Sequence, residues 1–166
     1  MSSFQNTSDP ADKACHWQEA QVTDDHFIES GGKTFAGYHL LVDLWQSSPF
    51  DIALSDMPLM RAALKECVDV CNATLLHIHL HHFEPNGGIS GVAVLAESHI
   101  SVHTWPERSF AAFDIFMCGN ATPHNAIAIL QRTFNPKNLD IRQELRGLVH
   151  QQEPATQNKF FPHENI

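Results

Sequence analysis

The sequence has little positive charge and no long apolar segment. Lys and Arg number 10 against 19 Asp and Glu, which gives the 166 residues a formal net charge of -9. This balance argues against binding of nucleic-acid phosphates, because such binding needs clustered basic residues. No apolar run approaches the roughly 18 residues of a membrane span. We therefore expect neither a nucleic acid nor a membrane as a partner.

The sequence also lacks the marks of a secreted protein. Residues 1–10 are polar, without the basic and apolar parts of a secretory signal peptide. Among the four cysteines there is no CxxC pair, since Cys67 and Cys71 are four positions apart. Free thiols are therefore a better explanation than a disulfide framework. A cytoplasmic location is the expectation.

The length predicts one domain flanked by two peripheral segments. A chain of 166 residues can bury one hydrophobic core. Residues 1–36 are polar and show no sustained apolar period, which predicts a loosely ordered extension. We expect the domain at residues 37–147, and a mobile tail at the Gln-rich residues 148–166.

The apolar pattern predicts strands and helices in alternation. Strands are expected at 38–45, 74–83, 89–95, 98–104, 110–116 and 138–145. One helix has Asp56 as its N-cap and Pro58 in its first turn, and a second opens at Thr122 and Pro123. This order is typical of an α+β fold. We predict a two-layer α/β sandwich, with a mainly antiparallel sheet and both helices on one face.

Reactive side chains are densest between His77 and Cys118. One arrangement would be a hydrolase with Ser98 as nucleophile and His103 as base. However, the sequence contains no GxSxG elbow. In a regular strand Ser98 and His103 would also point to opposite faces of the sheet, so their cooperation would need a bend or bulge.

Three histidines alternate along a predicted strand, namely His77, His79 and His81, and the other face carries Leu76, Ile78 and Leu80. Three imidazoles on one face could bind a divalent metal. This pattern supports an alternative function, a non-catalytic, His-rich metal-binding or regulatory protein. A solvated or interface sheet face explains the same pattern without a metal, and we predict no metal site.

Two stretches resemble the central motif of the prokaryotic S-adenosylmethionine decarboxylases: ESHISVHTWPE at 97–107 and AAFDIFMCG at 111–119. Three upstream elements fit the same family in the same order: GYHL at 37–40, FEP at 83–85 and ISGV at 89–92. The resemblance extends from about residue 37 to residue 147 and is highly specific.

The resemblance implies a self-cleaving proenzyme. Ser98 would attack the carbonyl of Glu97, with His103 as the base and Ser90 assisting, and the chain would be cut between residues 97 and 98. A pyruvoyl group would remain where Ser98 was, as the cofactor of a carboxy-lyase. In that family it forms a Schiff base with the substrate amine and accepts the electrons released with carbon dioxide. Cys118 matches the proton donor.

The resemblance also implies a substrate and partners. Phe83 would stack on adenine and Glu107 would bind the ribose hydroxyls. The expected function is S-adenosylmethionine decarboxylase, supplying the aminopropyl donor for spermidine biosynthesis. The turn at 83–90 is longer than the family's compact form, and the alternative is a pyruvoyl-dependent arginine or ornithine decarboxylase. The two cleavage fragments would form one αβ unit, and the family pairs these units into dimers.

Overall fold

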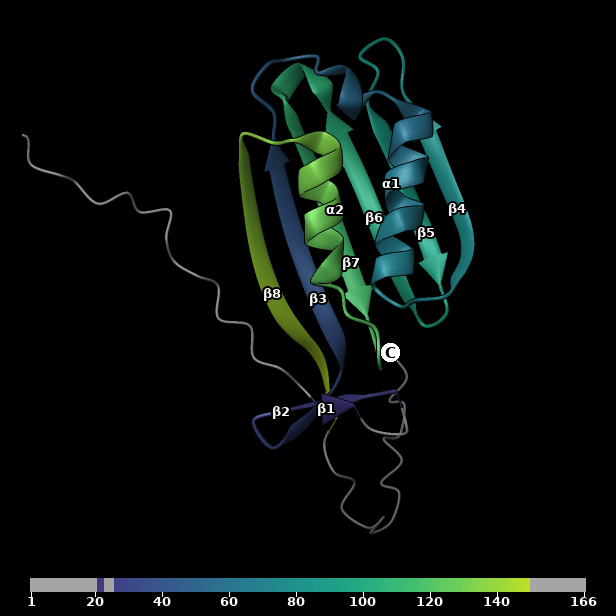
Figure 1. Cartoon of the computed structure of the whole chain (residues 1–166), viewed down its shortest axis with the longest axis vertical. Coiled ribbons are helices and arrows are strands. Elements are labelled where there is room, and N and C mark those ends of the chain that lie inside the picture. Colours follow the sequence, from purple (N-terminus) through teal and green to yellow (C-terminus); the bar gives the residue numbers. More distant parts are fainter. Residues whose placement is uncertain (1–20, 23–25, 150–166) are drawn as a thin grey trace, which may run out of the picture.

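The computed structural model describes residues 21–22 and 26–149 (Figure 1). The strands are β1 (Gln21–Val22), β2 (Ile28–Ser30), β3 (Lys33–Trp45), β4 (Leu75–His82), β5 (Ile89–Leu95), β6 (Ser98–Trp105), β7 (Phe110–Met117) and β8 (Asn138–Val149). The helices are α1 (Met57–Val70) and α2 (Asn125–Phe134), with short 3-10 helices at Ile52–Leu54 and Pro106–Arg108. Both α-helices pack against one face of an antiparallel sheet, which confirms the predicted sandwich.

The strand order of the sheet is β1-β2-β3-β7-β6-β5-β4, and β8 also pairs with β3. The register between β5 and β6 is regular, with Ser90 opposite His103 and Leu95 opposite Ser98. The pairing of β6 with β7 is equally regular. No bulge therefore changes the direction of side chains along β6 between Ser98 and His103.

Alternate strand residues form the core beneath the helices. The largest fully buried side chains include Leu40, Leu44, Met60, Leu64, Phe113 and Ile115. Cys67 and Cys71 of the α1 segment are also buried, as their helical spacing predicts. Burial raises the pKa of Cys67 to about 12 and that of Cys71 to about 11, so both act as small apolar side chains. Neither helix of the described residues has the length and hydropathy to cross a membrane.

The start of α1 follows the sequence prediction. The Asp56 carboxylate accepts a hydrogen bond from the Leu59 N–H at 2.9 Å, and Pro58 lies in the first turn. The cap satisfies an N–H group that has no acceptor inside the helix.

The start of α2 differs from the prediction. The regular helix begins at Asn125, whereas the sequence predicts Thr122 as its N-cap. The Thr122 hydroxyl accepts from the side-chain amide of Asn125 at 2.8 Å. Because this local side-chain bond uses the capping oxygen, residues 122–124 form a turn ahead of the helix.

The ordered fold begins before residue 37. Strand β3 starts at Lys33, and β2 pairs with it through residues 28–30. Ile28 is only 2% exposed, so this part of the N-terminal segment packs as part of the domain. The segment ahead of Gly37 therefore has structural contacts that its polar composition does not indicate.

The sheet face opposite the helices has no covering layer among the described residues (Figure 1). Trp105 and Val94 on this face are 41% and 40% exposed. His77, His79 and His81 of β4 are exposed here too. Ile78 and Leu80 are buried as predicted, but a register irregularity between Leu75 and His77 leaves Leu76 64% exposed.

Candidate active site

The turn between β5 and β6 places the predicted cleavage point at one end of the sheet. Leu95 pairs with Ser98, so the hairpin loop consists of Ala96 and Glu97 alone. Glu97 has a φ of 62°, in the left-handed region. For a residue with a Cβ this conformation costs about 1–2 kcal/mol. The backbone strain therefore lies on the residue whose carbonyl would be attacked.

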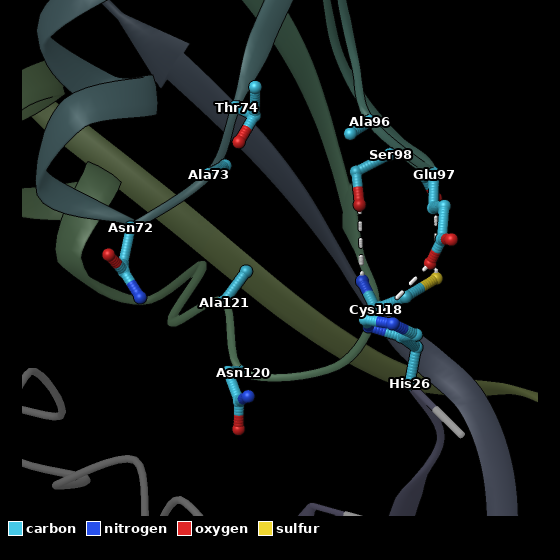
Figure 2. A pocket seen from close by; sticks show the side chains of 10 residues that line it. All are labelled: His26, Asn72, Ala73, Thr74, Ala96, Glu97, Ser98, Cys118, Asn120 and Ala121. Atoms are coloured by element: carbon cyan, nitrogen blue, oxygen red, sulfur yellow. Dashed lines mark hydrogen bonds and ion pairs between the residues drawn. The ribbon is translucent and has the colours of Figure 1, made fainter. Parts of the chain in front are cut away.

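Cys118 contacts both residues of the predicted cleavage point (Figure 2). Its backbone N–H donates to the Ser98 hydroxyl oxygen at 3.2 Å. Its thiol donates to the Glu97 carbonyl oxygen at 3.4 Å. A donor on this oxygen polarises the carbonyl and would stabilise negative charge that develops there.

Gly37 allows β3 to approach the end of β7 closely. A Cβ at this position would lie 2.4 Å from the Met117 carbonyl oxygen and 3.2 Å from the Cys118 sulfur. Only glycine fits this approach without a shift of the Met117 backbone. The first residue of the GYHL element therefore lies directly beside the thiol.

The surroundings of Cys118 favour its protonated form. Burial raises the pKa of this thiol above its ordinary value, and the nearby Glu97 carboxylate raises it further. The hydrogen bond with Ser98 acts in the opposite direction but is the smallest of these effects. A thiol with a raised pKa keeps its proton at neutral pH, as a proton donor must.

A cavity of about 230 Å³ opens beside these residues. It is lined by His26, Asn72, Ala73, Thr74, Ala96, Glu97, Ser98, Cys118, Asn120 and Ala121 (Figure 2). The walls come from the β5–β6 turn with the start of β6, the loops that follow α1 and precede α2, and His26 ahead of β2. The cavity thus brings Ser98 and Cys118 together with groups from other parts of the chain.

A second cluster lies further along β5 and β6, on the uncovered face. The Ser90 hydroxyl oxygen is 2.8 Å from Nδ1 of His103, because these residues are direct cross-strand partners. A cavity of about 280 Å³ is lined there by Phe83, Asn86, Gly88, Ser90, Thr104, Trp105 and Glu107. Both predicted substrate-binding residues, Phe83 and Glu107, therefore share this cavity with Ser90.

The two clusters are well separated within one chain. Ser98 and His103 are five positions apart on a regular strand, which corresponds to about 16 Å at 3.3 Å per residue. Ser98 shares the side of the buried Ile100, whereas His103 lies on the uncovered face. The opposite directions predicted from the sequence are thus present, and one chain does not bring the two side chains together.

Comparison with known proteins explains why these residues occur in this pattern. The sequence model of one family, S-adenosylmethionine decarboxylase, matches residues 38–147. The chain belongs to the S-adenosylmethionine decarboxylase family. The family identified from the sequence motifs is therefore confirmed.

Individual members of the S-adenosylmethionine decarboxylase family cover most of the chain. An S-adenosylmethionine decarboxylase proenzyme from Methanococcus maripaludis is 42% identical over 118 residues, 70% of this chain and 94% of that protein. A proenzyme of the same name from Thermomicrobium roseum is 39% identical over 114 residues, 68% of this chain and 95% of that protein. The crystal structure of adenosylmethionine decarboxylase from Aquifex aeolicus has a TM-score of 0.62 at 32% identity, covering 73% of this chain and 98% of that one.

One residue of the site lies outside the stretch that the S-adenosylmethionine decarboxylase family matches. His26 precedes residue 38 and lines the same cavity as Ser98 and Cys118. The sequence does not indicate it, because a single histidine in a polar segment without apolar periodicity carries no signal of its own. Only the folded chain places it beside Glu97 and Cys118.

The metal-binding alternative gains no support from the structure. Among the described residues, no group of three or more His, Cys, Asp or Glu side chains is arranged to hold a metal ion. His77, His79 and His81 are each exposed on β4. Their alternation follows from the two-residue period of a strand. The family to which the chain belongs is one of decarboxylases, which is a different function.

Proposed function

We propose that this chain is a self-cleaving proenzyme that becomes a decarboxylase of S-adenosylmethionine, with a pyruvoyl group formed from Ser98. The observation that carries the proposal is the contact of the Cys118 thiol with the carbonyl of Glu97, next to the Ser98 hydroxyl. Nucleophile, electrophile and hydrogen-bond donor meet at a strained turn, as cleavage at this bond requires.

The maturation steps can be written with these residues. The Ser98 oxygen attacks the Glu97 carbonyl carbon, the peptide C–N bond breaks, and an ester with a free amine at residue 98 results. Loss of the residue-98 α-proton then expels Glu97 as a carboxylate. Addition of water and loss of ammonia leave a ketone at residue 98. The left-handed backbone of Glu97 favours the first step, since release of the bond relieves its strain.

The α-proton must be removed by a base, and His103 of the same chain is too far from Ser98. We propose that a second copy of the chain supplies this base, with the uncovered sheet faces packed together. The proton to be removed lies on the backbone Cα of residue 98, the first residue of β6, so His103 of the other copy would reach it past the strand end although the Ser98 side chain points toward the helices. A two-fold axis would create two equivalent sites, each combining Ser98 and Cys118 of one copy with Ser90 and His103 of the other. The exposed Trp105 and Val94 would be buried at the same time.

When formed, the pyruvoyl group supplies an electron sink for the pair of electrons left by carbon dioxide. The residue that fits beside it is Cys118, which holds a proton on sulfur close to position 98. Partial burial of this side chain limits competing proton transfer from water. Cys118 thus has two roles, first on the Glu97 carbonyl and later as proton donor.

The cavity with Phe83 and Glu107 suits the nucleoside part of the substrate. An aromatic face stacks on a flat base and attracts a nearby sulfonium, while a carboxylate accepts two hydroxyl hydrogen bonds. Phe83 is 49% exposed, and its ring has an edge contact with that of His81 at a centroid distance of 4.5 Å, so part of the aromatic surface stays accessible for stacking. Arginine and ornithine have no base or ribose, so this cavity favours S-adenosylmethionine over both.

Release of carbon dioxide from carboxyl-labelled S-adenosylmethionine, arginine and ornithine tests the proposed substrate. We expect turnover of S-adenosylmethionine alone. Turnover of arginine or ornithine without turnover of S-adenosylmethionine would refute the choice of substrate and leave the cleavage mechanism intact. The role in spermidine biosynthesis and the cytoplasmic location stay predictions.

Glu107→Gln is expected to raise the KM for S-adenosylmethionine about tenfold or more and to leave self-cleavage unchanged. A hydrogen bond to a charged group contributes roughly 1.5–3 kcal/mol, and each 1.4 kcal/mol is about tenfold in affinity. Steady-state kinetics on the cleaved protein measures the effect. Asp69→Asn, an exposed change on α1, is the matched control. An unchanged KM in Glu107→Gln would contradict the ribose role.

A mixture of two inactive chains tests the shared site. Ser98→Ala lacks the nucleophile and His103→Ala lacks the base, so each alone is expected to stay uncut. When the two are co-expressed with different tags, we expect the His103→Ala chain to be cut and the Ser98→Ala chain to remain whole. A denaturing gel separates the outcomes. If neither chain is cut in the mixture although the wild type is, the base does not come from a second copy.

A further inference from the structure

His26 is held against the cleavage point by two separate contacts. Its carbonyl oxygen accepts a hydrogen bond from the Gly119 N–H at 2.9 Å, directly after Cys118. Its Nδ1 lies 3.9 Å from a carboxylate oxygen of Glu97 (Figure 2). His26 thus contacts Glu97 itself and the residue that follows Cys118.

The backbone at both ends of the first contact is adapted to it. His26 and Gly119 both have left-handed backbones, with φ of 62° and 60°. A Cβ at Gly119 would lie 3.2 Å from Nδ1 of His26, so the imidazole covers this glycine closely. The ring therefore has a defined place at the rim of the cavity, although it is exposed to water.

The Glu97 carboxylate is an electrostatic problem for self-cleavage. When Ser98 attacks, negative charge develops on the Glu97 carbonyl oxygen, and the carboxylate of the same residue opposes it. A group that pairs with the carboxylate would offset this opposition.

We propose that His26 is a positioning residue for self-cleavage, whose imidazole pairs with the Glu97 carboxylate and lowers the charge repulsion at the Glu97 carbonyl. This inference rests on the proposed function. It goes beyond the family pattern, because His26 lies outside the residues that the family matches. His26 acts through Glu97 and contacts neither substrate nor the reacting atoms.

The variant His26→Asn removes the imidazole with little disturbance of the backbone. Asparagine tolerates the left-handed conformation better than most residues, so the carbonyl contact with Gly119 should persist. Exposed ion pairs contribute about 0.2–1 kcal/mol, which at 1.36 kcal/mol per tenfold limits the effect to about fivefold. We expect cleavage of His26→Asn to be about two- to fivefold slower than that of the wild type.

A double-mutant comparison distinguishes charge pairing from a structural role. Cleavage is followed by pulse labelling in a cell-free translation system and denaturing gel electrophoresis of the full-length chain and its fragments. In Glu97→Gln the carboxylate is absent, so adding His26→Asn should change the rate no further. About 1 M salt should also reduce the difference between His26→Asn and wild type, because it screens exposed charges.

A matched control removes an exposed ion pair elsewhere. Arg132→Gln breaks the 2.6 Å pair with Glu66 on the helices and should leave the cleavage rate unchanged. Two results would overturn the role of His26 and leave the proposed function intact. One is a wild-type cleavage rate in His26→Asn. The other is that His26→Asn slows cleavage as much in the Glu97→Gln chain as in the wild type. A wild-type chain that is never cut refutes the proposed function and this inference with it.

Discussion

Ser98→Ala is expected to remain one uncut chain without decarboxylase activity. Alanine has no oxygen to attack the Glu97 carbonyl, so neither the ester nor the pyruvoyl group can form. The loss should be complete. Among the described residues that line the cavity, Thr74 is the one other residue with a hydroxyl group. Thr74 follows α1 and does not adjoin the peptide bond to be broken.

Denaturing mass spectrometry and release of labelled carbon dioxide measure the two losses. Ser48→Ala is the matched control. This serine is exposed in the loop after β3, away from the cleavage point and from the uncovered sheet face. Fragments in the Ser98→Ala sample would show that another residue is the nucleophile.

Cys118→Ala is expected to lose decarboxylation more severely than self-cleavage. General acid catalysis contributes roughly 100-fold or more, so turnover should fall by at least this factor. Cleavage should slow but proceed, because the Ser98 nucleophile and the strain at Glu97 remain. Single-turnover kinetics on the cleaved fraction separates the two effects. Wild-type turnover in Cys118→Ala would contradict its role as proton donor.

The pH dependence provides a second readout of Cys118. A raised pKa means that the thiol form persists to higher pH, so proton donation should be lost only above the ordinary thiol value of 9.0. Cleavage adds a carboxylate at the end of the first fragment, which shifts this pKa further in the same direction.

Cys118→Ser, which retains a donor to the Glu97 carbonyl, should cleave faster than Cys118→Ala.

Local signals predicted much of the fold. The cap at Asp56 and the strand β5 at Ile89–Leu95 depend on neighbouring residues, and the structure has them where the sequence places them. At Thr122 two local bonds compete, and a side-chain amide takes the oxygen that a helix cap would use. Composition alone does not decide between such alternatives, so the start of α2 was predicted wrongly.

The candidate site was predictable only in part. Strand periodicity correctly separated Ser98 from His103, while the motif linked Ser98 to Cys118. The pairing of Ser90 with His103 depends on the register between β5 and β6. This register depends on the exact ends of both strands and on the length of the turn, which the folded chain reveals. His26 reaches the site through contacts with residues far along the chain, at Glu97 and Gly119. Sequence spacing does not encode such contacts.

Denaturing mass spectrometry of the purified full-length protein tests the central claim most directly. The account predicts two fragments, one ending at Glu97 with a free carboxylate and one beginning at residue 98. The second should be lighter by one ammonia than a fragment beginning with an intact serine, as a pyruvoyl end requires. An intact chain after long incubation, or a second fragment with an ordinary serine at its start, would contradict it.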